Sequence, residues 1–288
     1  MTTEELRESL LAAPKNGYAR ITAEQKVEME SYCKRYMAFM DACKTEREAT
    51  AWAIAEAEKY GFVPYKPGME AKPGDKIYYN NRDKAIALAV IGTDSLANGA
   101  NICAAHVDSP RMDLKPNPLY EDSEIAYFKT NYYGGIKKYQ WVTIPLALHG
   151  VVYRKDGTGI TITIGEDDND PILMVSDLLP HLAADQMQKT AGKVIAGEQL
   201  NVILGPEPIE GEGSDLVKLN VMKWLHEKYG LIESDFLSAE LTIVPAGRCR
   251  EVGFDRSLIS AYGHDDRVCA YAELEALFTL PTPTKTAV

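Results

Sequence analysis

The stretch Ala104-Ala105-His106-Val107-Asp108-Ser109-Pro110 decides how the rest of the chain is interpreted. It includes the end of an apolar run, Ile102-Cys103-Ala104-Ala105, which predicts a buried strand. Because side chains alternate along a strand, His106 and Asp108 would point to the same side at its exit. One of them could then bind a metal while the other orients it through a hydrogen bond. The alternative is an ordinary loop His beside a loop Asp.

The composition is that of a soluble globular protein. Its 288 residues, 45% hydrophobic and 25% charged, suffice for one large domain or two ordinary ones. The net charge of −11 argues against nucleic acid or an anionic membrane as a partner, because both require a basic face. No apolar run approaches the ~20 residues that span a bilayer, and the polar N-terminus lacks the apolar core of a signal peptide. Five scattered cysteines favour reduced thiols, so we expect a cytoplasmic protein.

The first part of the chain predicts helices followed by strands. A capping box at Thr22 begins a helix that extends to about residue 44. A second helix is expected over 45–60, with Gly61 as the residue that ends it. Two strands, over 75–80 and 84–92, follow as a hairpin-like pair. With the apolar run before His106, this order favours an α/β domain of three layers, in which helices cover both faces of the sheet.

After Pro110 short strands dominate. The Pro-rich segment 113–120 predicts a linker. The acidic turn 166–170 lacks EF-hand spacing and favours a solvated loop over a calcium site. A helix is expected over 215–230. Strands that together indicate a small β domain are predicted over 125–131, 141–148, 150–154, 159–165 and 238–245.

A second polar cluster, His264-Asp265-Asp266-Arg267, lies between an apolar run and a predicted helix over 268–278. Adjacent carboxylates repel, and an Asp that caps the helix beside an Arg counter-charge would be a purely structural explanation. Both polar clusters, however, follow predicted strands of a parallel sheet, at whose ends open α/β folds place their sites. Histidine nitrogen and carboxylate oxygen suit a divalent ion, and a carboxylate between two ions can bridge them for hydrolysis.

Other catalytic motifs find no support. The chain contains no G-x-S-x-G elbow and no glycine-rich phosphate loop. A Cys–His hydrolase would need an exposed and activated thiol. Cys103 falls in the predicted buried strand and Cys269 in a predicted helix, so both are expected to serve packing.

At this point the chain resembles the aspartyl aminopeptidase-like dinuclear zinc aminopeptidases. The motifs whose order and spacing carry the resemblance are Ala105-His106-Val107-Asp108-Ser109-Pro110, Tyr133-Gly134-Gly135 with Trp141 and Pro145-Leu146-Ala147-Leu148, Leu179-Pro180-His181-Leu182, Gly263-His264-Asp265-Asp266-Arg267 and Lys285-Thr286-Ala287-Val288. The resemblance implies a three-layer α/β/α zinc-exopeptidase catalytic domain, incomplete here, over 1–110 and 251–288. It also implies an inserted β-rich domain over 111–250 that contributes to oligomerisation.

The resemblance further implies the site and the reaction. His106 would be a zinc ligand, Asp108 the catalytic carboxylate that orients its ring, and Asp265 the carboxylate that bridges two zinc ions, joined to Asp266 by a cis peptide. Such enzymes remove N-terminal residues from peptides by zinc-activated water, some with a preference for acidic residues, and assemble as large homo-oligomers. Cobalt or manganese are alternatives to zinc at an oxygen-rich site.

Three departures from the family pattern are visible. Thr143-Ile144-Pro145 stands where the family commonly has an Asp-Arg pair, and the Lys137-Lys138 region where it has an inter-subunit His. The family also continues beyond the strand that corresponds to 285–288 into a Glu-Glu pair and further Asp and His ligands. We therefore expect this chain to be the N-terminal part of such an enzyme. Two alternatives to an aminopeptidase remain: a non-catalytic assembly subunit and a small-substrate dinuclear amidohydrolase.

Overall fold

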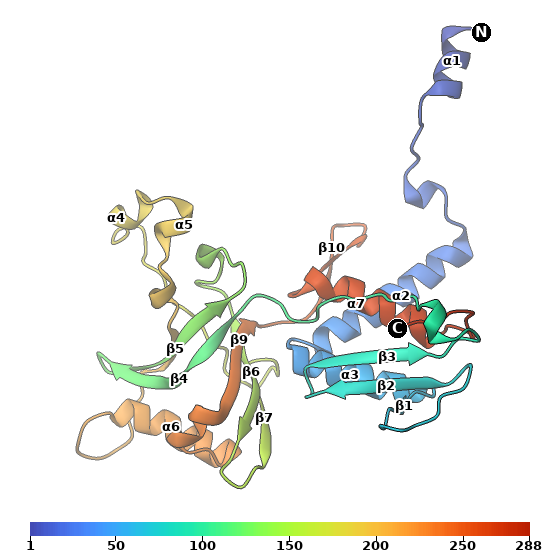
Figure 1. The fold of residues 1–288 in the computed structure, drawn as a ribbon. Coiled ribbons are helices and arrows are strands. Elements are labelled where there is room, and N and C mark those ends of the chain that lie inside the picture. Colours follow the sequence, from blue (N-terminus) through green and yellow to red (C-terminus); the bar gives the residue numbers. More distant parts are fainter.

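The structure is a computed structural model that describes all residues, 1–288, and it divides into two bodies joined by extended segments (Figure 1). The first body contains α2 (Ala23–Ala42), α3 (Glu46–Lys59), β1 (Val63–Pro64), β2 (Lys76–Asn81), β3 (Ala85–Val90), η2 (Leu96–Asn98), β10 (Arg250–Val252), β11 (Leu258–Ser260) and α7 (His264–Phe278). Two short elements, α1 (Thr3–Leu10) and η1 (Gly17–Ala19), precede α2 and extend away from this body (Figure 1).

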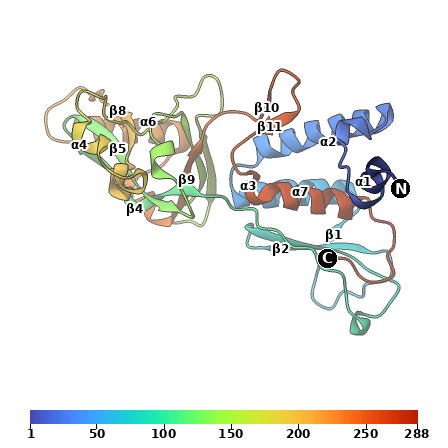
Figure 2. The ribbon, with the colours of Figure 1, turned by 90° about the horizontal axis from the view of Figure 1, so that it is seen from above.

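The predicted helices of the first body are present, and their capping explains their bounds. Thr22 and Gln25 form a capping box at the start of α2, and Thr45 and Glu48 form another at the start of α3. Gly61, with φ +85°, follows the end of α3 in the left-handed region that glycine tolerates. All three long helices lie on one face of the sheet (Figure 2). Helices on the opposite face, which the three-layer prediction requires, are not present in residues 1–288.

The sheet of the first body is mixed rather than parallel. β1 pairs with β2 in parallel, whereas β2 and β3 form an antiparallel hairpin. Ala287 then lies between Val90, with which it pairs antiparallel, and Asn101, with which it pairs in parallel. The prediction of a buried strand over 102–105 is wrong, because Ile102 is 71% exposed and regular pairing ends with the bond from Cys103 N to Val288 O. Residues 102–105 are apolar, as in a buried strand, but they would be buried only beside a neighbouring strand, which this segment lacks.

The second body is built on a six-stranded antiparallel sheet. Its strand order is β7-β6-β9-β4-β5-β8. The strands are β4 (Arg111–Asp122), β5 (Ile125–Tyr133), β6 (Leu146–Tyr153), β7 (Gly159–Ile164), β8 (Val202–Gly205) and β9 (Ala239–Pro245). The helical elements of this body are η3 (Lys138–Gln140), α4 (Ala184–Met187), α5 (Ala191–Val194), η4 (Gly197–Gln199), α6 (Leu216–Tyr229) and η5 (Glu233–Ser238).

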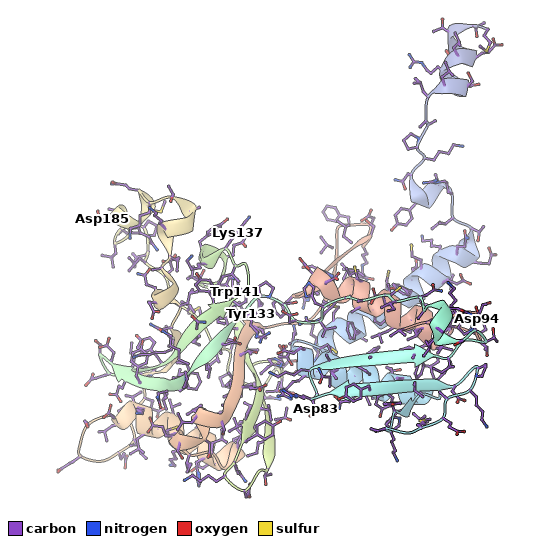
Figure 3. The ribbon with its side chains drawn as sticks, viewed as in Figure 1. Asp83, Asp94, Tyr133, Lys137, Trp141 and Asp185 are labelled. Carbon is purple, nitrogen blue, oxygen red and sulfur yellow. The ribbon has the colours of Figure 1, made fainter.

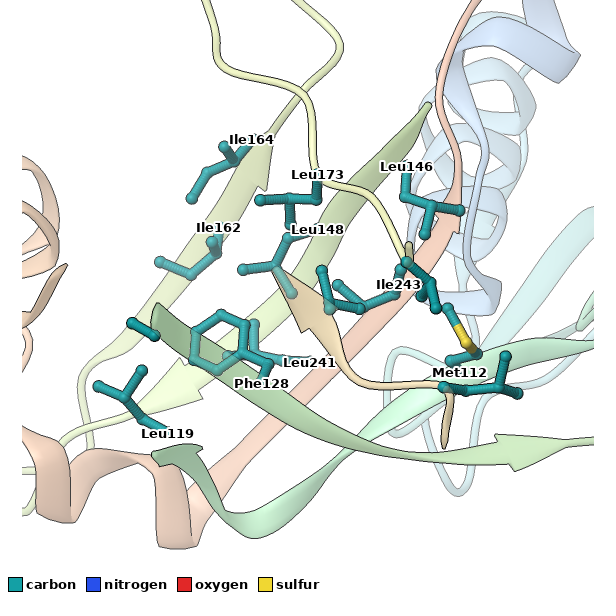
Figure 4. Packing of buried hydrophobic residues seen from close by; sticks show 14 of the residues in the cluster. Met112, Leu119, Phe128, Leu146, Leu148, Ile162, Ile164, Leu173, Leu241 and Ile243 are labelled. Atoms are coloured by element: carbon teal, nitrogen blue, oxygen red, sulfur yellow. The ribbon is translucent and has the colours of Figure 1, made fainter. Parts of the chain in front are cut away.

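One face of this sheet carries the main hydrophobic core. Phe128, Leu148 and Ile243, at most 2% exposed, pack together from three different strands (Figure 4). The Pro-rich segment 113–120, expected as a linker, belongs to β4 instead. Its two prolines fall where the pairing of β4 with β5 is interrupted between Leu114 and Leu119, the kind of irregularity in which a strand tolerates proline.

A buried charged group joins the two bodies. His149 on β6, only 3% exposed, contacts Glu48 at the start of α3 through Nδ1 (2.8 Å) and Glu166 after β7 through Nε2 (3.1 Å). Burial of the ring disfavours its charged form, but the two carboxylates outweigh this and raise the pKa of His149 to about 9. Glu166 was expected in a solvated loop, and the structure instead uses it as a partner of this imidazole.

Candidate metal centre

The two polar clusters found in the sequence meet in the structure. His106 lies in a segment without regular secondary structure that joins the two bodies, and Asp265 lies at the start of α7. The two segments are held together by Arg267 Nε, which donates to Val107 O (3.0 Å), and by Ser109 Oγ, which donates to Asp265 O (3.1 Å). His106 and Asp265, which are 159 residues apart in the sequence, are thereby brought into contact.

His106 stands between the two carboxylates named with it. Its Nε2 is 3.2 Å from Asp265 Oδ1, and its Nδ1 is 3.1 Å from Asp108 O and 3.2 Å from Asp108 Oδ1. Partial burial opposes protonation of the ring, but the hydrogen bonds to Asp108 and Asp265 and the charge of Asp108 prevail and raise the pKa of His106. The side chain of Asp265 is 94% exposed, so its second oxygen is accessible to a ligand.

The start of α7 lacks the aspartate cap that the purely structural explanation of the second cluster predicts. The N-cap residue is Gly263, at φ +87°, and no side chain caps the helix. Asp265 and Asp266 have non-helical dihedral angles and are joined by a cis peptide bond. Arg267 is not a counter-charge for the carboxylates, because its guanidinium is fully buried and donates to backbone carbonyl groups. Asp265 is therefore left free to face His106.

Sequence reasoning missed one contact that the second body supplies. Tyr133, at the end of β5, donates its hydroxyl to Asp108 Oδ2 (2.7 Å), on the edge of the second body that faces the first (Figure 3). This bond to the carboxylate raises the pKa of Tyr133. Arg111 lies 4.6 Å from the centre of the Tyr133 ring and contacts Glu46 of α3 at 3.1 Å. The motif Tyr133-Gly134-Gly135 is recognisable in the sequence, but its spacing gives no indication of a contact with Asp108.

The donors fit zinc in type but not in number. An imidazole nitrogen and a carboxylate oxygen are ordinary zinc ligands, and Asp108 beside Nδ1 is placed as an orienting carboxylate would be. A zinc site expects about four ligands. No group of three or more His, Cys, Asp or Glu side chains in residues 1–288 could hold a metal ion. This chain therefore offers two of the donors that such a site requires.

The cysteines do not form an alternative site. Cys103 and Cys269 are both exposed, so the expectation that they serve packing is wrong. Cys103 lies where the pairing with residues 286–288 ends, so its side chain is not covered by a neighbouring strand. The nearby carboxylate of Asp266 raises the pKa of the Cys269 thiol, which disfavours the reactive thiolate. No helix of the structure combines the length and apolar character needed to cross a membrane.

Comparison with known proteins identifies the chain's relatives. The sequence pattern described as aminopeptidase I zinc metalloprotease (M18) matches residues 39–287. A protein of Clostridium acetobutylicum named "Probable M18 family aminopeptidase 1" is 49% identical over 284 residues, which are 97% of this chain and 61% of that protein. The chain thus spans about 60% of the length of the curated relatives it matches.

Solved structures agree in fold. An M18 aminopeptidase from Thermotoga maritima superimposes with a TM-score of 0.90 and 46% identity, over 96% of this chain and 60% of the other. Aminopeptidase I from Borrelia burgdorferi superimposes with a TM-score of 0.86 and 41% identity, over 95% of this chain and 63% of the other. The mixed α/β fold of this chain is therefore that of M18 aminopeptidases over the matched region.

Proposed function

Because this chain belongs to the aminopeptidase I zinc metalloprotease family (M18), we propose that it supplies part of a zinc aminopeptidase site. The observation that carries the proposal is the 3.2 Å approach of His106 Nε2 to Asp265 Oδ1 from two distant segments. The substrates are peptides, from which N-terminal residues are removed.

Each residue has a distinct role. His106 and Asp265 would hold zinc, which supplies Lewis acidity and an activated water for hydrolysis. Asp108 orients the His106 ring through Nδ1 and so fixes which nitrogen is free for a metal. Tyr133 in turn fixes Asp108 through its hydroxyl. The chain's own residues thus prepare one imidazole nitrogen and one exposed carboxylate oxygen.

The domain division and assembly state follow from the same family reading. We propose a catalytic domain over 1–110 and 251–288, part of a three-layer α/β/α fold, with an inserted domain over 111–250 that mediates homo-oligomerisation. In support, the inserted region exposes a group of large apolar side chains between β7 and α5, namely Ile172, Met174, Leu178, Leu179, Leu182 and Met187. Analytical ultracentrifugation would test this, and a strictly monomeric chain would contradict it.

Zinc binding tests the site independently of turnover. Isothermal titration with Zn²⁺ is expected to show one weak site in this chain and none in His106→Ala or Asp265→Asn. His181→Ala, which removes an exposed histidine, is the matched control and should leave binding unchanged. Unaltered zinc binding in His106→Ala would refute the proposed ligand.

A second candidate is a non-catalytic assembly subunit, which the exposed apolar side chains of the inserted region favour. Hydrolysis of amino-acid p-nitroanilides by the zinc-loaded chain would exclude it, whereas zinc binding without turnover would support it. Digestion of a peptide mixture separates an aminopeptidase, which shortens peptides stepwise from the N-terminus, from a small-substrate amidohydrolase.

A further inference from the structure

Arg111 extends the contacts of the candidate metal centre to the joint between the two bodies. It is the first residue of β4 and lies directly opposite Tyr133 in the antiparallel pairing of β4 with β5. Its guanidinium carbon is 4.6 Å from the centre of the Tyr133 ring, within the ~6 Å range of a cation–π contact. Tyr133 donates its hydroxyl to Asp108, whose other carboxylate oxygen lies beside Nδ1 of His106. An unbroken series of contacts therefore leads from Arg111 to the candidate zinc ligand.

All three guanidinium nitrogen atoms of Arg111 donate to carboxylates. Nε donates to Asp113 Oδ1 on the same strand (2.8 Å), and Nη1 and Nη2 donate to the two carboxylate oxygens of Glu46 (3.1 and 3.3 Å). Glu46 is the first residue of α3, so this two-pronged contact joins the second body to the first. The Arg111 side chain is only 13% exposed. Its guanidinium is therefore held in one orientation and has no free prong for the carboxylate of a substrate.

The ring of Tyr133 depends on this guanidinium for its orientation. The residue is 44% exposed and does not belong to the hydrophobic core of the second body. A cation over the face of the ring opposes its displacement, and the direct cross-strand pairing keeps the two residues side by side. If the ring swings away, Asp108 Oδ2 loses the hydroxyl that donates to it.

We propose that Arg111 is a positioning residue of the zinc centre, which holds the Tyr133 ring so that its hydroxyl fixes Asp108 beside His106. The role toward zinc rests on the proposed function, whereas the hold on Tyr133 can be measured without a metal. Because Arg111 is anchored on Glu46, the orientation of the zinc ligand also depends on how the two bodies are placed against each other.

A second arginine at the joint provides a matched control. Arg47 of α3 donates through Nε (2.9 Å) and Nη2 (2.7 Å) to Glu240 of β9, and its side chain is 21% exposed. It therefore joins the same two bodies through a carboxylate, but it has no contact with the Tyr133 ring. Replacement of either arginine by lysine keeps the charge and removes the planar group. Only at Arg111 should this change reach the zinc centre.

Zinc affinity, measured by isothermal titration, tests the role toward the metal. Arg111→Lys is expected to weaken zinc binding about threefold, and Arg47→Lys by less than about 1.5-fold. Arg111→Lys combined with Tyr133→Phe should bind zinc as Tyr133→Phe alone does, because Arg111 acts through the hydroxyl that phenylalanine lacks. If Arg111→Lys does not fold, Glu46→Gln loosens the same contact from the first body and should weaken zinc binding about twofold. Equal losses in the two lysine variants, or additive losses in the double variant, overturn the proposal.

A measurement on the metal-free chain separates this role from the proposed function. In a chain labelled with ¹³C at the tyrosine Cζ atoms, the signal of Tyr133 is identified by its loss in Tyr133→Phe. At pH 7.5 Arg111→Lys should move this signal toward those of exposed tyrosines, because the bond to Asp108 weakens, whereas Arg47→Lys should leave it in place. An unmoved signal in Arg111→Lys overturns the positioning role whatever the zinc affinity. A moved signal in a chain that binds no zinc refutes the proposed function and leaves the hold of Arg111 on Tyr133 established.

Discussion

At the scale of single residues, Arg267 determines how the candidate metal centre is assembled. Its guanidinium is fully buried, and burial lowers its pKa. It donates to three backbone carbonyl groups, those of Val107 (3.0 Å), Lys44 (2.8 Å) and Tyr262 (3.5 Å). These carbonyl groups belong to the His106 segment, the turn before α3 and the turn before α7. One side chain thus connects all three segments around the site.

Replacement of Arg267 by lysine should therefore destabilise the chain. A lysine ammonium cannot reproduce the planar fork that spans three carbonyl groups, so at least one charge-assisted bond is lost, at a cost of about 1.5–3 kcal/mol. Urea unfolding would measure the loss. Arg256→Lys, at a side chain that is 77% exposed, should stay within about 0.5 kcal/mol of the parent. Equal stability of the two variants would show that the carbonyl contacts are dispensable.

Tyr133 acts on the site through Asp108, so its hydroxyl can be removed without disturbing the core. Tyr133→Phe is expected to weaken zinc binding by up to about tenfold, because Asp108 loses the donor that fixes it. The free energy of unfolding should change by less than about 0.5–1 kcal/mol, since the ring is 44% exposed. Tyr132→Phe, at a neighbouring and equally exposed ring, is the control, and identical zinc affinities in the two variants would contradict the positioning role.

At the scale of elements, the close approach of β6 and β9 depends on one glycine. A Cβ atom on Gly150 would lie 1.9 Å from the carbonyl oxygen of Glu240, and its φ of +140° is unfavourable for other residues. Gly150→Ala should therefore cost about 3 kcal/mol or more, because the backbone of the central strands must shift. Gly157 also has a positive φ (+85°) but open space around it, so Gly157→Ala should cost only about 1 kcal/mol. Urea unfolding of both variants separates the clash from the dihedral penalty.

Elements defined by local signals were predictable from sequence, and those defined by distant partners were not. The capping box at Thr22 predicts the start of α2 correctly, because both of its partners lie within four residues, and Gly61 correctly predicts where α3 ends. The segment 102–105 has the apolar pattern of a strand, but its burial depends on a neighbour elsewhere in the chain. β4 was missed because its prolines imitate a linker, while its actual partners lie on β5 and β9.

The candidate site shows the same limit. His106, Asp108 and Asp265 were selected from local motifs and a family resemblance, and the structure brings them together. Tyr133 could not be selected, because its contact with Asp108 depends on how one body is placed against the other.

At the scale of the whole molecule, the relative placement of the two bodies rests on buried and half-buried charges. Arg47 of α3 contacts Glu240 of β9 at 2.7 Å, and Arg111 of β4 contacts Glu46 of α3 at 3.1 Å. These four side chains line a polar cavity between the two bodies. His149 is more deeply buried than these four charged residues, at 3% exposure, and it also contacts both bodies. Its protonation should therefore affect how firmly the two bodies are held together.

The stability of the molecule should consequently fall as pH rises toward 9. The folded-state pKa of His149 is raised to about 9 against about 6.5 when unfolded, so its protonation favours the folded state. This contribution, about 3 kcal/mol, is fully present below pH 6.5 and is lost as pH rises through 9. The charged groups that face the ring are the carboxylates of Glu48 and Glu166. The ammonium of Lys44 lies behind Glu166, with its Nζ 3.9 Å from Glu166 Oε1.

Urea unfolding at pH 6 and at pH 9.5, compared between the parent chain and His149→Gln, measures this contribution directly. The parent should lose more stability than the variant between the two pH values, because the glutamine amide does not titrate. Other groups that titrate in this range are present in both proteins. The difference between their losses of unfolding free energy therefore measures the contribution of His149 alone. His181→Gln, at an exposed histidine, should follow the parent at both pH values. Parallel pH profiles of parent and His149→Gln would mean that the imidazole does not hold its charge between the two bodies.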